Sequence, residues 1–407
     1  MNKVIVLGGG AAGFFAAIHA AMHGAEVTIL EKSAKLLSKV KVSGGGRCNV
    51  TNVITDPALL VLNYPRGQKE LRGPFTRFSS FHTREWFENR GVRLKVEADG
   101  RVFPVSDNSQ SIVDCLMAAA LDHRVEIILN AGVDEIIPAP NGFILKGENR
   151  EWSADSVIIA TGGRQSQQAY HWLASLGHHI IEPVPSLFTF NIPGSQFTDL
   201  MGLSVDHVRI KLSGTRLESE GPLLFTHWGL SGPAVLKLSA FAARELFERK
   251  YDFQIAVNIF PDMNEETLRE KLFVHAGENR LKRIRNSKFG DLPVRLWERM
   301  VELAGITDHM NWADAGKTHI NKLISNFSAL VFHVSGKTTF KEEFVTCGGV
   351  DLRDLNMQKM ESKKVPGIYF AGEVLNIDGI TGGFNFQAAW TTGYISGVSA
   401  AKKNPDR

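Results

Sequence analysis

The chain of 407 residues lacks three features, and each absence excludes a class of protein. It lacks paired cysteines, because Cys48, Cys115 and Cys347 stand far apart in the sequence. Structural disulfides and a metal site are therefore not expected, and a reducing, cytoplasmic location is expected instead. It lacks long basic runs and carries a formal net charge of only +3, so no nucleic acid is expected as a partner. It lacks any stretch near the ~18 apolar residues of a membrane span, so no membrane contact is expected.

The length and composition predict a globular protein of several domains. With 43% apolar and 22% charged residues, the chain has the composition of an ordinary globular protein. Its length exceeds what one simple hydrophobic core supports, so two or three domains are expected. The densest basic stretch, residues 282–285, is interpreted as the solvated face of a helix rather than as a nucleic-acid site.

The first 31 residues predict a βαβ unit. Residues 3–7 are apolar and β-branched, which is typical of a strand buried in a parallel sheet. A glycine-rich turn over 8–13 precedes an alanine-rich helix over 14–23, and residues 25–30 form the second strand, which ends at Glu31. A strand, a Gly-x-Gly-x-x-Gly turn, a helix and an acid in this order indicate a dinucleotide-binding site.

Each part of this motif has a physical role. Gly8 allows a tight turn, Gly10 leaves room for a pyrophosphate at the backbone, and Gly13 lets the helix lie close to the strand. The helix N-terminus presents free N–H groups and the positive end of a dipole to the phosphates. Glu31 stands where a carboxylate accepts the ribose hydroxyls, and it disfavours a 2′-phosphate.

The far end of the chain favours FAD over NAD as the dinucleotide. Residues 367–373 predict a buried strand that ends in Gly-Glu, residues 378–385 a glycine-rich turn, and residues 386–402 a helix. Two strand–turn–helix units at opposite ends of the chain indicate one split domain that closes on one long ligand. The N-terminus of the last helix is expected to stabilise negative charge on a reduced flavin.

Two further strands, over residues 125–129 and 156–160, add to the same predicted domain. The backbone of Val133, which follows the first of them, is expected to meet the adenine. The second leads into a Thr-Gly-Gly turn over residues 161–163, which is common in flavoproteins and is expected to line the cofactor.

Three stretches carry a family resemblance. Residues 42–52 read Val-Ser-Gly-Gly-Gly-Arg-Cys-Asn-Val-Thr-Asn, and residues 224–233 and 346–350 carry further distinctive motifs. They resemble a bacterial family of NAD(P)/FAD-dependent oxidoreductases that includes aminoacetone oxidase-like and bile-acid enone reductase-like flavoproteins. The resemblance runs from residue 1 to about residue 400. Cys347 departs from the pattern, because alanine is expected there more often.

The resemblance implies an α/β fold. A FAD-binding Rossmann domain of the glutathione-reductase type is expected, split by an inserted β-rich, barrel-like domain that carries a small helical subdomain. The expected boundaries are 1–186 and 345–407 for the FAD-binding domain, 187–262 and 326–344 for the inserted β-rich domain, and 263–325 for the helical subdomain. The apolar patterns permit this division, because strand-like runs come first within the insertion and predicted helices follow over residues 265–275, 293–304 and 312–324.

The resemblance also places the glycine loop of residues 43–49 beside the flavin, where Arg47 is expected to pair with a phosphate and Asn49 with a flavin heteroatom. Cys48 has no partner cysteine nearby, so it is interpreted as a small packed residue rather than as half of a dithiol relay. The residues expected to bind the FAD are Gly8, Gly10, Ala11, Ala12, Gly13, Glu31, Lys32, Ser43, Gly44, Gly45, Gly46, Arg47, Cys48, Asn49, Val133, Thr161, Gly162, Gly163, Gly372, Glu373, Gly383, Phe384 and Asn385.

The FAD supplies the redox chemistry in such proteins, and the chain supplies orientation and electrostatics. His227, within Thr-His-Trp-Gly-Leu-Ser-Gly-Pro, is the best candidate for a catalytic acid or base, and His82 and Arg164 are weaker candidates. A second Gly-x-Gly-x-x-Gly unit is missing from the sequence. NAD(P)H, if it is the cosubstrate, is therefore expected to dock transiently over the flavin.

The sequence leaves three functions open. The leading one is a FAD-dependent oxidoreductase that transfers hydride between flavin N5 and a small organic substrate, with NAD(P)H as the expected electron donor. The second is an amine oxidase, similar to the aminoacetone oxidases, that returns electrons to O₂. The third is a non-redox or tRNA-modifying FAD protein. Neither the nicotinamide preference nor the oligomeric state follows from the sequence.

Overall fold

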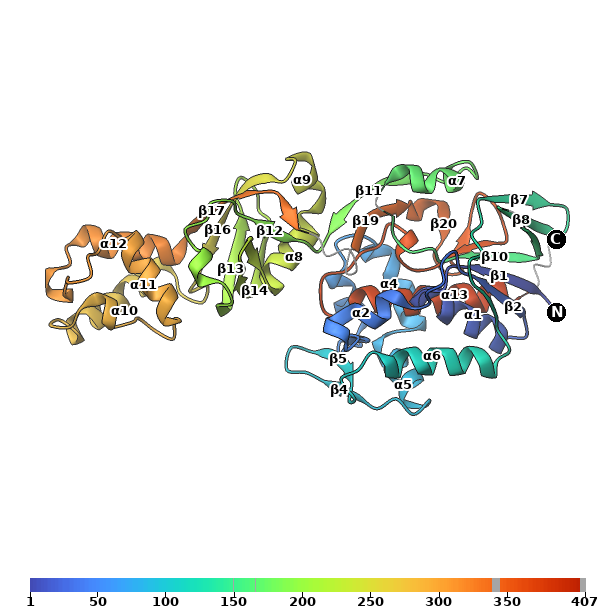
Figure 1. Ribbon diagram of the computed structural model, residues 1–407, viewed down its shortest axis with the longest axis horizontal. Helices are drawn as coiled ribbons and strands as arrows, with labels where there is room; N and C mark the ends of the chain where they lie inside the picture. The colour runs from blue at the N-terminus through green and yellow to red at the C-terminus, as the bar shows by residue number, and fades with distance from the viewer. Residues whose placement is uncertain (149, 165, 339–344, 403–407) are drawn as a thin grey trace. The chain divides into compact units, whose positions relative to one another are not determined.

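The computed structural model describes residues 1–148, 150–164, 166–338 and 345–402 (Figure 1). The chain divides into two compact units. The first combines the described parts of Met1–Ser186 and Phe340–Arg407, and the second is formed by those of Leu187–Thr339. Among the described residues, no helix has both the length and the apolar character that a membrane crossing requires.

A seven-stranded sheet forms the centre of the first unit (Figure 1). Five of its strands are parallel, and two short antiparallel strands extend one edge. In spatial order they are β20 (Leu355–Asn356), β21 (Glu361–Ser362), β22 (Ile368–Phe370), β10 (Ser156–Ile159), β1 (Lys3–Leu7), β2 (Glu26–Leu30) and β6 (Glu126–Ile128). Because parallel strands end at the same edge of a sheet, the turns after β1, β2, β10 and β22 gather there.

Smaller sheets and helices complete the first unit. Its helices are α1 (Ala11–Met22), α2 (Ser38–Gly46), α3 (Pro57–Leu60), α4 (Gln68–Arg77), α5 (Ser80–Glu88), α6 (Gln110–Asp122), α7 (His171–Ala174) and α13 (Phe384–Ala400), with the 3₁₀ helices η1 (Val61–Asn63), η2 (Gln167–Tyr170), η6 (Leu352–Asp354) and η7 (Gly372–Val374). Its other strands are β3 (Thr51–Asn52), β4 (Leu94–Val96), β5 (Arg101–Pro104), β7 (Glu135–Ala139), β8 (Gly142–Gly147), β9 (Arg150–Ala154), β11 (Ile180–Ser186) and β19 (Val345–Val350).

Helices α1 and α13 pack closely side by side, although they come from opposite ends of the chain (Figure 1). Two glycines of α13 permit this approach. A Cβ atom at Gly393 would lie 2.8 Å from the Ala12 carbonyl oxygen, and one at Gly397 would lie 2.3 Å from that of Ala16. Aromatic side chains from both helices, Trp390 among them, continue into one apolar core beside the sheet. This packing holds the first and last predicted βα units together.

The chain leaves and re-enters the first unit through paired strands. Strand β11 ends at Ser186, the last residue of the unit before the second unit begins, and β19 runs antiparallel to it. Ser186 pairs with Val345 in this register. The two connections to the second unit are therefore adjacent at their first-unit ends.

The second unit is built on a fully antiparallel seven-stranded sheet. In spatial order its strands are β17 (Leu330–Ser335), β16 (Asp252–Asn258), β13 (Ser204–Leu212), β14 (Glu218–Phe225), β15 (Gly229–Ser231), β12 (Thr189–Asn191) and β18 (Lys337–Thr338). Its helices are α8 (Pro233–Phe241), α9 (Ala243–Glu248), α10 (Glu265–Glu278), α11 (Val294–Leu303) and α12 (Lys317–Ser328), with η3 (Thr198–Leu200), η4 (Ile284–Asn286) and η5 (Trp312–Asp314). One core cluster runs from the sheet into the last three helices.

The fold class predicted from the sequence is confirmed, and the errors lie at element ends. The predicted helix over 14–23 begins earlier, at Ala11, because Gly10 already caps it. The helix predicted from residue 312 is a 3₁₀ turn there, and α12 begins only after Gly316. The interpretation of residues 282–285 as a helix face is wrong, because this stretch is a turn that ends in η4.

Candidate functional site

The glycines of the first turn fall into two kinds. A Cβ at Gly8, where φ is +111°, would lie 2.5 Å from the Ala160 carbonyl oxygen, and one at Gly13 only 1.9 Å from that of Gly8. These two glycines are required by the packing of the protein itself. The Cβ position of Gly10, in contrast, has no described atom within 4 Å. Gly10 therefore faces open space at the N-terminus of α1, where Ala11 and Ala12 begin the helix, as a pyrophosphate site requires.

The Glu31 carboxylate is held beside this turn. One of its oxygens accepts a hydrogen bond from the Gly9 N–H at 2.8 Å, and the other accepts from the N–H and hydroxyl of Ser33 at 2.9 and 2.8 Å. The backbone of Ala131 donates to the Glu31 carbonyl at 2.9 Å, which brings the segment leading to Val133 alongside. The carboxylate is thus fixed in orientation at the end of β2.

Two cations lie close together next to Glu31. Burial lowers the pKa of Lys32, the nearby Arg164 lowers it further, and Glu31 opposes both effects. Arg164 follows the turn of Thr161, Gly162 and Gly163, and its backbone N–H donates to the Tyr170 hydroxyl at 3.0 Å. Like charges near one carboxylate favour an anionic ligand.

The glycine loop at the C-terminal end of α2 has a non-helical backbone. The helical conformation is lost at Ser43, where ψ is 148°, and Gly44, Gly45 and Gly46 follow with φ of 59°, 69° and 82°. All three glycines therefore have left-handed backbones that side chains disfavour. The Cβ positions of Gly45 and Gly46 have no described atom within 4 Å. The loop can thus approach a ligand through its backbone.

Protein partners surround the two polar residues that follow this loop. The Arg47 guanidinium pairs with Glu97 at 2.7 Å and lies over the Phe103 ring, 4.0 Å from its centroid. One orientation of the Asn49 side-chain amide gives both its oxygen and its nitrogen a hydrogen-bond partner. In this orientation the oxygen accepts from the Gly383 N–H at 2.9 Å, and the nitrogen donates to the Thr51 carbonyl at 3.0 Å. Asn49 therefore joins the glycine loop to the start of α13.

Cys48 lies inside the apolar core of the first unit. Burial raises the pKa of its thiol to about 12, although a hydrogen bond with Ser43 opposes the shift. Only the thiolate is a good nucleophile, so this thiol is unreactive at neutral pH. Cys115 and Cys347 are also buried, and neither takes part in a disulfide within the described part of the chain. The cysteines of the chain are thus packed residues.

Four separate segments meet at Glu373. Its carboxylate accepts from the Thr346 N–H at 2.9 Å and forms an ion pair with Lys39 at 2.6 Å. A Cβ at Gly163 would lie 2.7 Å from the same carboxylate, so glycine is needed there. A Cβ at Gly372, where φ is +75°, would lie 2.7 Å from the Cβ of Ala12. The Gly-Glu pair after β22 therefore lies against the start of α1.

The start of α13 forms the other side of the candidate site. Gly383 caps the helix with φ of +90°, and a Cβ there would lie 2.4 Å from the Thr51 carbonyl oxygen. The Asn385 side chain accepts from the Gly379 N–H and donates to its carbonyl, both at 2.9 Å, and Phe384 is buried. The first N–H groups of a helix have no partner within the helix, so α13 presents a positive end here.

Sequence reasoning missed three residues that hold this turn. Asp378 is fully buried and pairs with Arg66, and the Tyr64 hydroxyl donates to the Phe384 carbonyl at 2.6 Å. The acid next to a glycine turn was a visible signal, because a buried charge needs a partner. Its partner lies 312 positions away, and no local pattern indicates it.

The predicted catalytic histidine lies in the second unit. His227 and Trp228 are the central residues of a tight turn between β14 and β15, closed by a bond from Thr226 N–H to the Gly229 carbonyl at 2.8 Å. The imidazole is exposed and meets the Trp228 ring edge to face at 4.3 Å. The indole N–H donates to the Thr189 hydroxyl at 3.1 Å, which fixes the turn. The catalytic role of His227 stays a prediction.

The weaker candidate His82 has a structural role. Its Nδ1 accepts from the backbone N–H of Ser79 at 3.0 Å and so closes a capping box at the start of α5. An imidazole held in this way orders the helix end.

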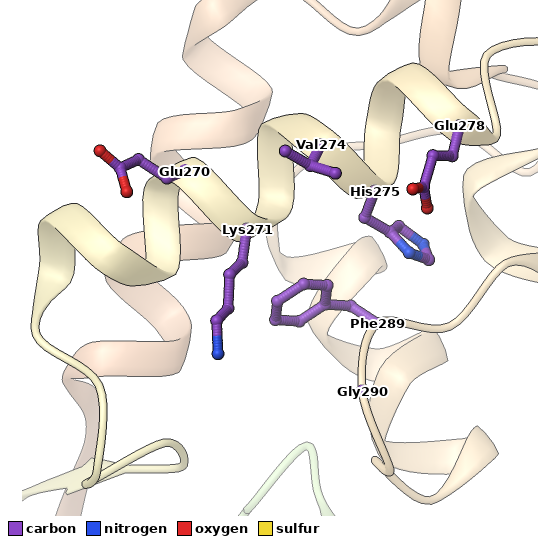
Figure 2. Close-up of a pocket in the computed structure, with 7 residues that line it drawn as sticks. All are labelled: Glu270, Lys271, Val274, His275, Glu278, Phe289 and Gly290. Atoms are coloured by element: carbon purple, nitrogen blue, oxygen red, sulfur yellow. The ribbon is translucent and has the colours of Figure 1, made fainter.

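An open hollow of about 430 Å³ in the second unit contains none of the predicted site residues (Figure 2). Five residues of α10 and two of the following segment line it. Figure 2 shows the Lys271 side chain beside the Phe289 ring, with His275 beyond it. His275 is held by the Ser287 carbonyl at 3.0 Å. The hollow is a surface feature of the helical region.

The geometry of the first unit fits FAD. Open backbone lies at Gly10 and at Gly45 and Gly46, a fixed acid ends β2, and the starts of α1 and α13 converge where the parallel strands end. Fold and site together define a FAD-dependent oxidoreductase.

Comparison with known proteins identifies the family. The chain belongs to the HI0933-like protein Rossmann domain family, whose model matches residues 2–399. It is 28% identical over 413 residues to the 3-dehydro-bile acid delta(4,6)-reductase of Clostridium scindens, covering 99% of this chain and 100% of that one. It is 30% identical over 400 residues to the ribosomal RNA dihydrouridine synthase of Escherichia coli, covering 96% of each.

Solved structures share the fold at low sequence identity. A 3-ketosteroid-Δ4-(5α)-dehydrogenase of Rhodococcus jostii RHA1 matches with a TM-score of 0.52 and 14% identity, covering 98% of this chain and 97% of that one. A flavocytochrome c3 fumarate reductase matches with a TM-score of 0.51 and 16% identity, covering 98% of this chain and 78% of that one.

Proposed function

We propose that this FAD-dependent oxidoreductase reduces a carbon–carbon double bond conjugated to a carbonyl group, with NAD(P)H as the electron donor. One observation carries the proposal. Two relatives that align over nearly the whole chain are named for a delta(4,6)-reductase of a 3-dehydro-bile acid and for a dihydrouridine synthase. The substrates differ, but both names describe the addition of hydrogen to a double bond conjugated to a carbonyl.

The residues of the first unit support this chemistry. FAD, when bound, supplies hydride transfer to the electron-poor carbon of such a bond. The positive end of α13 stabilises negative charge at the cofactor, and Asn49 and Asn385 fix the backbone around that helix end. The buried Cys48 thiol, with its raised pKa, is unsuited to a disulfide relay. Electrons are therefore proposed to pass directly between nicotinamide and flavin.

The second carbon of the double bond must receive a proton, and His227 is the proposed donor. Its exposed imidazole stands at the tip of a turn that Trp228 and Thr189 hold in place. A His227→Gln variant should keep its FAD and its reduction by NAD(P)H but lose at least tenfold in substrate turnover. Full turnover in this variant would remove His227 from the mechanism.

Two substrate classes follow from the two relatives. A small-molecule enone is the first. A uridine within ribosomal RNA is the second, by analogy with the E. coli enzyme, which is 30% identical over 96% of each chain. A second observation supports it as well: Arg280, Lys282 and Arg283 are exposed in the turn before η4, and none of them has an ion pair within the described part of the chain.

Substrate-dependent consumption of NADPH separates the classes. The purified protein would be supplied with NADPH and either a panel of cyclic enones or undermodified ribosomal RNA, and the products analysed by mass spectrometry. A saturated ketone or dihydrouridine as product supports the proposal and assigns the class. Oxidation of an amine by O₂ without NADPH would instead establish the amine oxidase alternative.

A further inference from the structure

A buried ion pair lies next to the candidate flavin site. The Asp378 carboxylate is fully buried, and it accepts hydrogen bonds from Arg66 Nε at 2.6 Å, from Arg66 Nη2, and from the Ser186 hydroxyl at 2.7 Å. The Arg66 side chain is only 15% exposed. Burial raises the pKa of Asp378, whereas the charge of Arg66 and the hydrogen bonds lower it. The carboxylate is stable as an anion only while these donors remain.

The turn that follows Asp378 depends on contacts from outside. Residues 379–383 lie between the pair and the cap of α13, and Gly382 and Gly383 have φ of +130° and +90°. Such a glycine-rich backbone has wide conformational freedom and does not hold one shape by itself. Whatever fixes this turn therefore also fixes the first N–H groups of α13.

The segment of residues 63–67 supplies several of these contacts. The Ile380 N–H donates to the Asn63 carbonyl at 2.9 Å, and the Tyr64 hydroxyl donates to the Phe384 carbonyl at 2.6 Å. A Cβ at Gly67 would lie 2.8 Å from the Ile377 side chain, so the Gly67 backbone lies directly against that side chain. Arg66 is the charged member of this segment, and it contacts Asp378, the residue directly before the turn.

Ser186 connects the pair to another part of the fold. It ends β11, and the next residue begins the second unit. Its hydroxyl donates to the same Asp378 oxygen that Arg66 contacts through Nη2. One carboxylate thus joins the flavin-facing turn, the segment before α4 and the point where the chain leaves the first unit.

We propose that Arg66 and Asp378 are positioning residues for the flavin, which fix the turn of residues 379–383 against α13 and link it through Ser186 to the end of β11. The proposal requires FAD to lie at the start of α13 but is independent of the substrate. Removal of Arg66 leaves a buried carboxylate that must take up a proton or move toward solvent. Either response changes the turn.

The test separates positioning from simple stability. Arg66→Met leaves an unpaired buried acid, whereas Arg66→Met combined with Asp378→Leu replaces the whole pair by apolar side chains and is expected to restore folding. The matched control is Arg209→Met, which breaks an exposed arginine–carboxylate pair with Glu220 in the second unit. The readouts are the melting temperature of the apoprotein, the dissociation constant of FAD and the visible spectrum of the bound flavin.

We expect the double variant to melt near the wild-type temperature but to bind FAD at least tenfold more weakly, with an altered flavin spectrum. The control should match the wild type in all three readouts. Wild-type affinity and spectrum in a folded double variant would overturn the proposal, because the pair would then contribute only stability.

A milder set of variants keeps the test decisive if the double variant does not fold. Asp378→Asn removes the negative charge but keeps the shape, and it should move the midpoint potential of the bound flavin to more positive values. Ser186→Ala should weaken FAD binding at least threefold with little change in melting temperature. An unchanged potential in the first variant and unchanged affinity in the second would overturn the proposal. These readouts need no substrate, so their outcome is independent of whether the proposed reductase activity is correct.

Discussion

The three glycines of the first motif show at the residue level how one sequence pattern combines two physical demands. Gly8 and Gly13 are required because a side chain would strike the protein's own backbone, at 2.5 and 1.9 Å. Gly10 has an extended backbone with φ of −93°, which any residue adopts, and open space beside it. The fold does not require glycine at this position, which is what we expect of a residue that lies against a ligand.

A Gly10→Val variant should therefore fold normally and fail to hold FAD. We expect the stability of its apoprotein to stay within about 0.5 kcal/mol of the wild type, while the FAD content after purification falls at least tenfold. The comparison variant is Gly13→Ala, which should lose about 1–3 kcal/mol of stability through overpacking. Urea unfolding and flavin absorbance measure the two effects. Normal flavin content in Gly10→Val would contradict the placement of the pyrophosphate.

His19 predicts a pH dependence of stability. Its ring is buried among aromatic side chains, neither ring nitrogen has a hydrogen-bond partner among the described residues, and burial lowers its pKa to about 3. In the unfolded chain the group titrates near its ordinary value of 6.5. Between these values the unfolded state binds a proton that the folded state does not. Stability is therefore full above pH 6.5 and falls by about 1.4 kcal/mol per pH unit as the pH drops toward 3.

A His19→Leu variant should flatten this part of the stability curve, as measured by urea unfolding from pH 7 to pH 4. The control is His171→Leu, which removes an exposed histidine of the same unit and should leave the slope unchanged. Equal slopes for wild type and His19→Leu would show that the buried imidazole does not resist protonation.

At the level of elements, α13 is held to the rest of the first unit by a buried amide. Gln387 accepts from the hydroxyls of Thr51 and Thr83 at 2.6 and 2.9 Å, and it donates to that of Thr391 at 3.0 Å. Its side chain is fully buried. The helix that begins at the candidate flavin site is thereby joined to β3 and α5.

Gln387→Leu should leave two buried threonine hydroxyls unpaired and cost about 2–4 kcal/mol of stability. Denaturant unfolding of the apoprotein measures this loss, and Gln358→Leu, a change at an exposed glutamine of the same unit, is the matched control. A loss below about 0.5 kcal/mol, typical of surface substitutions, would mean that the amide network contributes little.

The elements also show what the sequence predicts well. Short β-branched runs such as residues 3–7 and 156–160 predicted the central strands closely, because such residues suit strands buried on both faces. The ends of helices were less predictable: the helix expected from residue 312 is interrupted before Gly316 caps α12. Pairings such as Arg66 with Asp378 were out of reach, because tertiary packing alone brings those residues together.

The same limit holds for the site. Gly8 and Gly13 were predictable, because each answers a packing demand of the backbone that a local motif encodes. The partners of Arg47 were not: a phosphate was expected, and the structure places Glu97 and the Phe103 ring around the guanidinium. Which charge meets a surface arginine depends on strands that the local sequence does not specify.

At the scale of the whole molecule, the residues expected to bind FAD all belong to the first of two compact units. A ligand that binds only the folded form stabilises it by mass action, by about 2.7 kcal/mol at a free concentration 100 times its dissociation constant. Hydrogen exchange with and without FAD should therefore show added protection at β1, β2, β10 and the start of α13, and little change in α10–α12. Equal protection of both units would contradict a site built by the first unit.

The most direct test of the proposed activity is anaerobic mixing of the FAD-loaded protein with NADH or NADPH, followed by an electron acceptor. We predict that one of the two nucleotides bleaches the visible flavin absorbance. We also predict that an α,β-unsaturated ketone or undermodified ribosomal RNA then restores that absorbance. If neither nucleotide bleaches the flavin, this protein is not a reductase of conjugated double bonds. The same holds if O₂ restores the flavin absorbance but neither the ketone nor the RNA does.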